Sequence, residues 1–206
     1  MIHDAIRAIK SLDRHGLEDA MRRGAIALGA HGLLERLVAP LTDQIGELWR
    51  SGVLTAAHEH FASAVIRHHL VSATRPFAPG SGAPDIVVTT PSGQLHELGA
   101  IIVAAAAADV GWHVTYLGPS LPPAEIAAAA AQNKSRAVAL SIVYPEDDRS
   151  LPNEIETLRR YLPLQVALFV GGRAASAYEE VLAKVGARRP ATLQHLYDEL
   201  NALRRS

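Results

Sequence analysis

Two groups of residues carry side chains suited to holding a metal-containing, flat ligand. The first is Trp49 followed by Glu59 and His60, and the second is a short run that contains Gln94 and His96. A neutral imidazole is the commonest protein ligand of transition metals, and a neighbouring acceptor usually fixes its tautomer. We therefore predict His96 as an axial metal ligand that the amide oxygen of Gln94 could orient. Trp49, Glu59 and His60 would form a lid over the same ligand.

Each of these assignments has a simpler structural alternative. His96 and Gly99 form an H-x-x-G pattern, which is common by chance, so the histidine could equally be a helix cap or a surface residue. In the functional interpretation, Gly99 lets a bulky planar group approach the backbone closely. The spacing of Trp49 to Glu59 and His60 is rarer, and its simpler alternative is a core tryptophan beside an exposed charged turn.

Further candidates lie where predicted strands end. Ser141 ends an apolar run, and a buried hydroxyl there needs a partner, either the backbone or a polar ligand. Gly171 and Gly172 follow another apolar run. Their lack of side chains either leaves room for a ligand to pass or simply allows a turn. Gly118 follows a third run. Because the carboxyl ends of parallel strands share one edge, we expect these residues to converge with His96.

Composition and charge exclude several classes of protein. The 206 residues carry a formal net charge of −1 without a basic face, so direct binding of nucleic acid is not expected. The absence of cysteine excludes disulfides and thiolate metal sites. No apolar run reaches the ~18 residues that span a membrane, and no secretion signal is visible, which predicts a cytoplasmic protein. The clustered histidines His58, His60, His68 and His69 lack a third ligand at zinc spacing.

Residues 76–85 contain three prolines and two glycines, and we place the domain boundary and a hinge there. Upstream, residues 1–78 show helical periodicity and are predicted to form an all-α cap, a four-helix bundle. In this bundle Gly16 separates the first two helices, Pro40 kinks the third, and Thr55 caps the fourth.

Downstream, residues 79–206 alternate between β-rich runs and helical runs, which predicts a Rossmann-like (flavodoxin-like) parallel sheet covered on both faces. The fold class is therefore α/β with an all-α cap. The predicted strands are Ile86–Thr90, His113–Leu117, Ala137–Val143, Val166–Val170 and a short fifth strand near Ala187.

These residues, in this order, resemble the signature of cobalamin-binding modules over nearly the whole chain. The signature is acid-x-His-x-x-Gly, then Ser-x-Leu or a near variant, then Gly-Gly. The corresponding residues here are Gln94, His96 and Gly99, then Ser141 with Val143, then Gly171 with Gly172. The resemblance implies that His96 replaces dimethylbenzimidazole as the lower axial ligand of cobalt and that the displaced tail passes Ser141. It implies the following cofactor-binding residues: Trp49, Glu59, His60, Gln94, Glu97, Leu98, Gly99, Gly118, Leu121, Ser141, Val143, Gly171 and Gly172.

The pattern of Trp49, Glu59 and His60 resembles the cap of light-sensing cobalamin regulators of the CarH type. The resemblance implies adenosylcobalamin as the cofactor, with methylcobalamin or hydroxocobalamin as alternatives. It also implies that light cleaves the cobalt–carbon bond and that the cap then shifts. His60, or His58, would take the vacated upper position. The shift would change association with a second copy or with a protein partner in transcriptional regulation.

Two features depart from that family. Gln94 stands where an acid is usual, which implies a weaker lower cobalt bond. The helix-turn-helix domain of the mercury-resistance-regulator class is not seen, which leads us to expect either a stand-alone sensor or a shortened chain.

Two alternatives to a photoreceptor stay open. A corrinoid methyl carrier of a methyltransferase system shares the helical cap and the His-x-x-Gly module, but the Trp49 pattern suits a larger upper ligand. A degenerate interaction module that binds no corrin is the other. In both the photoreceptor and the carrier interpretation, the chain itself is not an enzyme. A mutase would need a substrate domain for which 206 residues leave no room.

Overall fold

The computed structural model describes residues 1–74, 80 and 82–205. The chain forms two compact units, Met1–Phe77 (the helical unit) and Ala78–Ser206 (the sheet unit). Residues 76–79 and 81 of the hinge expected at 76–85 lie outside the described residues. Among residues 1–74 and 82–205, no helix combines the length and the apolarity needed to cross a bilayer.

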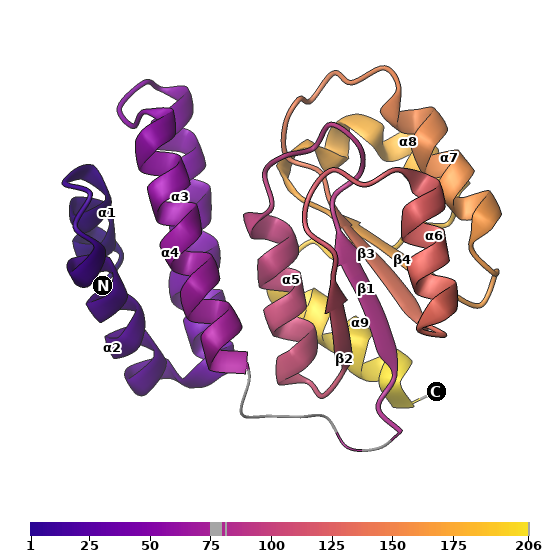
Figure 1. The fold of residues 1–206 in the computed structure, drawn as a ribbon, viewed down its shortest axis with the longest axis horizontal. Coiled ribbons are helices and arrows are strands. Elements are labelled where there is room, and N and C mark those ends of the chain that lie inside the picture. The colour runs from indigo at the N-terminus through magenta and orange to yellow at the C-terminus, as the bar shows by residue number, and fades with distance from the viewer. Residues whose placement is uncertain (75–79, 81, 206) are drawn as a thin grey trace. The chain divides into compact units, whose positions relative to one another are not determined.

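The helical unit contains four principal helices, as the apolar periodicity predicts (Figure 1). They are α1 (Ile2–Lys10), α2 (Arg14–Leu33), α3 (Ala39–Arg50) and α4 (Ala56–Thr74). Their buried faces carry aliphatic residues, among them Ile9, Leu17, Leu41 and Ile66, each fully or almost fully buried. The amphipathic repeat therefore forms an apolar interior within this unit.

Two details of the bundle differ from expectation. The break between the first two helices is not at Gly16 but earlier, where Leu12 adopts a φ of 53°. Asp13 then caps α2 by accepting a hydrogen bond from the Gly16 amide at 3.0 Å. The kink expected inside a helix at Pro40 is replaced by a π-helical segment, Leu34–Val38, so that Pro40 falls in the first turn of α3, where an amide proton is not needed.

The sheet unit is built on four parallel strands in the order β2-β1-β3-β4. The strands are β1 (Asp85–Thr89), β2 (His113–Tyr116), β3 (Ala137–Ser141) and β4 (Ala167–Gly171). This order is that of flavodoxin-like sheets, so the predicted fold class is confirmed. The expected fifth strand is wrong, since that segment contributes only a bridge between Phe169 and Arg188.

Helices cover both faces of this sheet, which explains why its central strands, β1 and β3, are apolar over most of their length. They are α5 (Leu98–Asp109), α6 (Pro123–Gln132), α7 (Leu151–Tyr161), η2 (Arg173–Tyr178), α8 (Glu179–Lys184) and α9 (Leu193–Arg205). Figure 1 shows α5 and α9 on one face and α6, α7 and α8 on the other. Alternate strand residues, such as Val87, Val138 and Leu168, join α6, α7 and α8 in one core cluster.

The strand order sets where loops can meet. After β1 the chain turns to one side of the sheet towards β2, and after β3 it continues to the other side towards β4. The loops that follow β1 and β3 therefore part at the carboxyl edge, which is the place where sheets of this kind bind ligands. Residues 90–97 and 142–150 form these two loops.

The Gly171-Gly172 pair lies at the end of β4, and its two members meet different constraints. Gly172 has a φ of 94°, and a Cβ there would stand 2.4 Å from the carbonyl oxygen of Ile142. A Cβ on Gly171 would meet nothing within 4 Å. Gly172 is thus required by the backbone, whereas Gly171 leaves open space.

We predict that Gly172→Ala lowers the free energy of unfolding of the sheet unit by about 2–4 kcal/mol, because backbone strain and steric overlap add. The matched variant Gly171→Ala should stay within about 1 kcal/mol of the parent protein. Both are measured by urea unfolding in a Trp49→Phe background, where the fully buried Trp112 is the sole tryptophan and reports on the sheet unit. Equal losses for the two variants would contradict the assignment.

Candidate functional site

His96 lies on the loop between β1 and α5, at the carboxyl edge where the strand order predicts a ligand site. Its ring is half-buried and packs against the ring of Tyr144, which lies on the loop after β3. The ring centroids are 6.0 Å apart and the planes meet at 85°, an edge-to-face contact. The sequence interpretation missed Tyr144, whose one visible signal is its place directly after Val143.

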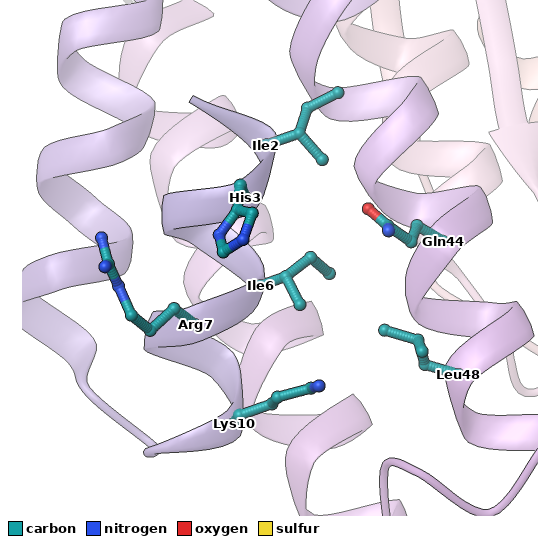
Figure 2. A pocket seen from close by; sticks show the side chains of 7 residues that line it. All are labelled: Ile2, His3, Ile6, Arg7, Lys10, Gln44 and Leu48. Carbon is teal, nitrogen blue, oxygen red and sulfur yellow. The ribbon is translucent and has the colours of Figure 1, made fainter.

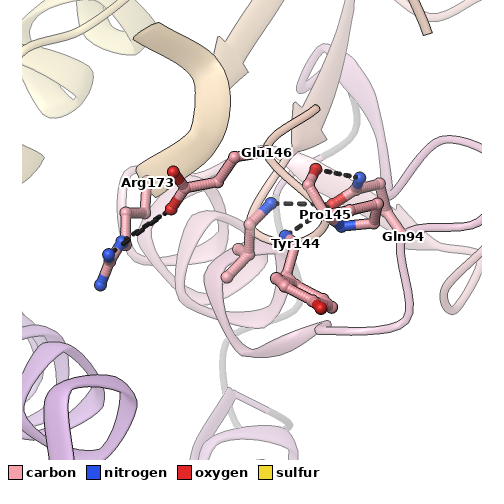
Figure 3. A network of polar contacts seen from close by, with 6 residues as sticks. Gln94, Tyr144, Pro145, Glu146 and Arg173 are labelled. Atoms are coloured by element: carbon pink, nitrogen blue, oxygen red, sulfur yellow. Dashed lines mark hydrogen bonds and ion pairs between the residues drawn. The ribbon is translucent and has the colours of Figure 1, made fainter. Parts of the chain in front are cut away.

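Gln94 joins the same two loops through its buried carboxamide (Figure 3). Its Oε1 accepts hydrogen bonds from the amides of Val143 at 2.9 Å and Tyr144 at 3.0 Å. Its Nε2 donates to the carbonyl oxygen of Pro145 at 3.3 Å. Two donors occupy the two lone pairs of the amide oxygen, so the expectation that this oxygen orients the His96 ring is wrong.

Ser141 and Gly99 face each other beneath this edge. The Ser141 side chain is buried, and its Oγ has no hydrogen-bond partner among the residues that the structure describes. A Cβ on Gly99 would stand 2.4 Å from that Oγ. Gly99 therefore makes room for the serine hydroxyl, and the close approach of a planar group to its backbone stays a prediction. A buried hydroxyl without a partner is costly, which indicates that a polar group from elsewhere completes it.

Open space lies on the neighbouring strand. Ser141 is in register with Gly171 across the β3–β4 pair, and a Cβ on Gly171 would meet no atom within 4 Å. A Cβ on Gly118, which follows β2, would also meet no atom within 4 Å. The carbonyl oxygen of Gly118 accepts a hydrogen bond from Thr89 Oγ1 at 2.7 Å. The edge thus presents one unsatisfied hydroxyl beside glycines that leave space.

The remaining predicted residues of the sheet unit surround this edge. Glu97, directly before α5, accepts a hydrogen bond from the Tyr116 hydroxyl at 2.5 Å, a contact that the sequence did not suggest. Leu98 begins α5 and is buried. Leu121 forms a parallel bridge with Pro91, which links the loops after β1 and β2.

The loop after β3 is fastened at its far end as well. The Asp148 amide donates to the Tyr178 hydroxyl oxygen at 2.9 Å, and burial raises the pKa of Tyr178. Hydrogen bonds from Ser150 lower the pKa of Asp148, which keeps this carboxylate ionised as an acceptor. Glu146 and Arg173 form an ion pair at 3.4 Å, drawn in Figure 3. The loop that carries Tyr144 is therefore held by several contacts.

In the helical unit, the turn between α3 and α4 separates Trp49, near the end of α3, from Glu59 and His60 in the first turns of α4. Glu59 is 14% exposed and accepts a hydrogen bond from Ser63 at 2.8 Å. Its other oxygen lies 2.6 Å from Nδ1 of His60, whose ring is 78% exposed. An ionised carboxylate can only accept, so Nδ1 is the donor in this contact, and in the neutral imidazole Nε2 is the nitrogen that carries a lone pair.

His58 is held differently. Its Nδ1 lies 2.7 Å from Thr55 Oγ1 and its Nε2 lies 3.3 Å from the carbonyl oxygen of Lys10. Both ring nitrogens are therefore engaged inside the helical unit, which favours His60 as the histidine that can bind a further group.

A groove of about 590 Å³ lies elsewhere in the helical unit, between α1 and α3 (Figure 2). Ile2 and Ile6 face Leu48 across it, and Lys10 is among the polar residues that line it. None of the predicted site residues lines this groove.

Comparison with protein families matches both units. A B12 binding domain model matches residues 84–189, and a second B12 binding domain model matches residues 1–70. The chain is 28% identical over 180 residues to the HTH-type transcriptional repressor CarH of Myxococcus xanthus, a match of 87% of this chain and 60% of that protein. It is 31% identical over 152 residues to the repressor CarA of the same organism, covering 73% and 52%. The chain thus spans between half and two thirds of the length of these relatives.

Two solved structures are similar in fold. The monomethylamine corrinoid protein of Methanosarcina barkeri gives a TM-score of 0.72 at 15% identity, over 97% of this chain and 96% of that one. A cobalamin-binding protein from Desulfitobacterium hafniense DCB-2 gives a TM-score of 0.51 at 19% identity, over 98% of each chain. At these identities the likeness supports the fold alone.

The residues at the carboxyl edge fit the group that these families bind. The unsatisfied hydroxyl of Ser141 suits a polar atom of the cofactor tail, and the space at Gly171 suits its passage. His96 supplies an imidazole at the same edge. One imidazole and one unsatisfied hydroxyl at the same edge are chemically suited to a corrin, which already holds its own cobalt.

We predict that Gly99→Ala lowers the free energy of unfolding of the sheet unit by about 1–3 kcal/mol, because its Cβ overlaps Ser141 Oγ. Ser141→Ala alone should cost less than about 1 kcal/mol, since its hydroxyl forms no bond within the described protein. In the double variant the overlap is gone, so most of the Gly99→Ala loss should be recovered. Urea unfolding followed by Trp112 emission in the Trp49→Phe background measures all three variants, and additive losses would refute the proposed steric pairing.

Proposed function

Since the chain belongs to the B12-binding domain family, whose model matches residues 84–189, we propose that it binds adenosylcobalamin with His96 as the lower axial ligand of cobalt. The observation that carries this proposal is the carboxyl edge of the sheet unit. There, an imidazole, a buried hydroxyl without a partner and open glycine positions belong to adjacent strand ends. Ser141 would hold a polar atom of the displaced tail and Gly171 would leave it room.

The proposed biological role is that of a sensor domain in transcriptional regulation. The relatives CarH and CarA are named as HTH-type transcriptional repressors, and they match most of this chain. The chain would influence transcription through association with a second copy or with a protein partner. The pairing of a helical unit with a sheet unit supplies two bodies whose arrangement a ligand can bias.

We propose light as the signal. Adenosylcobalamin supplies a cobalt–carbon bond that visible light can break. Trp49 would pack on the upper axial group, and Glu59 and His60 would bond its polar atoms. When light removes the upper group, these contacts are lost. They then no longer favour one arrangement of the helical unit relative to the sheet unit. Glu59 lies 2.6 Å from Nδ1 of His60, so in the neutral ring Nε2 would be the nitrogen that occupies the vacated upper position.

A corrinoid methyl carrier is the second candidate. The fold likeness to the monomethylamine corrinoid protein favours it. The combination of Trp49, Glu59 and His60 argues for the sensor, because a methyl group is too small to need a tryptophan and a hydrogen-bonding pair around it.

The first test is an absorption spectrum of the protein loaded with adenosylcobalamin in the dark, freed of unbound cofactor and then illuminated with green light. We expect a stable dark spectrum that converts to a new, protein-bound species. The His96→Ala variant should bind at least about tenfold more weakly, because a ligand bond is lost. A light product identical to free aquocobalamin would favour the carrier, and absence of retained corrin in the parent protein would overturn His96 as ligand.

A second test concerns the upper side. Trp49→Ala should keep hydroxocobalamin affinity unchanged but weaken adenosylcobalamin binding on the order of tenfold, about 1.4 kcal/mol, because an aromatic contact to the adenosyl group is lost. Trp49→Phe, which keeps an aromatic ring, is the matched control and should lose less. Isothermal titration in the dark with both cobalamins measures the difference. Equal weakening for the two cofactors would contradict the assignment of Trp49 to the upper group.

A further inference from the structure

Tyr144 is a residue to which neither the sequence motifs nor the family comparisons draw attention. It follows directly after β3, in the loop that begins with Ile142. Its ring meets that of His96 at a centroid distance of 6.0 Å and an interplanar angle of 85°. Edge-to-face contacts of this kind depend on direction, so the contact restricts how the imidazole can turn about its side-chain bonds.

Gln94 builds this contact. Its carboxamide is fully buried and bonds three consecutive backbone residues, Val143, Tyr144 and Pro145. Figure 3 shows the carboxamide between the loop that bears it and the loop of Tyr144. Because Gln94 lies two residues before His96 on one chain segment, these bonds fix the position of Tyr144 relative to His96.

The amide is chemically better suited to this task than an acid. Oε1 accepts two hydrogen bonds while Nε2 donates a third to the Pro145 carbonyl. An ionised carboxylate could accept the first two but would place a second oxygen against that carbonyl. With glutamine at position 94, His96 has no acid at this neighbouring position. In return, the amide forms a third hydrogen bond that holds the loop after β3.

We propose that Tyr144 is a positioning residue for His96 and that Gln94 holds it in place. This inference rests on the proposed function, in which His96 binds cobalt. The contact limits the rotation of the imidazole and keeps its ligating nitrogen aimed at the ligand site. This edge-to-face ring contact sets the position of the imidazole by packing.

The test uses the full chain loaded with cob(II)alamin and measures electron paramagnetic resonance. Nitrogen bound to cobalt splits the signal, and histidine labelled with the heavy nitrogen isotope changes that splitting only when the ligand comes from the protein. The readout is the ratio of histidine-bound to histidine-free cofactor. This ratio reports the ligand itself, and a general loss of stability does not alter it.

We expect Tyr144→Ala to lower this ratio by about three- to tenfold, the size of one aromatic pair contact. Tyr144→Phe keeps the ring and should retain the parent ratio. Tyr161→Ala is the matched control, since Tyr161 is 57% exposed on α7 and Tyr144 is 53% exposed. The exposure of Tyr144 means that its removal should leave the fold intact, which Trp112 emission verifies.

An unchanged ratio in Tyr144→Ala, with histidine bound in the parent protein, would overturn this inference alone. A loss in Tyr144→Phe as large as in Tyr144→Ala would overturn it too, because the hydroxyl and not the ring would then be responsible. Absence of the histidine signal in the parent protein would overturn His96 as ligand, and the role of Tyr144 with it.

Discussion

The candidate site depends on one buried carboxamide at the point where the sheet changes winding direction. The loops after β1 and β3 leave the sheet towards opposite sides, so the topology alone does not hold them together. Gln94 crosses between them with three hydrogen bonds and is itself fully buried. Each of these part-buried hydrogen bonds contributes about 0.5–1.5 kcal/mol, so together they favour a single loop geometry.

The space below this connection is shaped by the absence of side chains. Gly99 makes room for the Ser141 hydroxyl, Gly172 lets the chain pass the backbone of Ile142, and Gly171 leaves its own side open. The three glycines of one signature therefore serve different purposes. One protects a polar group, one permits a close backbone approach, and one leaves a path. A functional group that is buried but not satisfied is tolerated in such a place because an incoming ligand can complete it.

Much of this architecture could be predicted from the sequence because it is encoded locally. The four strands lie close to their predicted positions, since apolar runs bounded by turn residues are local signals, and Thr192 caps α9 as expected. The errors concern contacts between distant segments. The partners of the Gln94 amide are about fifty residues away, and the neighbour of Gly99 lies on another strand, so spacing in the sequence gave no information about either. The prediction of a fifth strand near Ala187 was wrong because this segment forms only an isolated bridge, between Phe169 and Arg188. The assignments of the remaining site residues stay predictions.

The two histidines assigned to cobalt lie in opposite environments, and this contrast bears on how a switch could work. His96 is half-buried and packed against an aromatic ring, which favours a ligand that stays in one orientation. His60 is 78% exposed, and its proton is directed to a carboxylate that is itself largely buried. The carboxylate partner orients the ring, while exposure leaves the ring free to approach a ligand or to leave it. A histidine that stays bound to cobalt needs a side chain with restricted rotation. A histidine that binds only after the upper group leaves needs a suitable tautomer and a mobile side chain. In the proposed switch, the same residue type would serve both tasks because its neighbours differ: an aromatic ring for His96 and a carboxylate for His60.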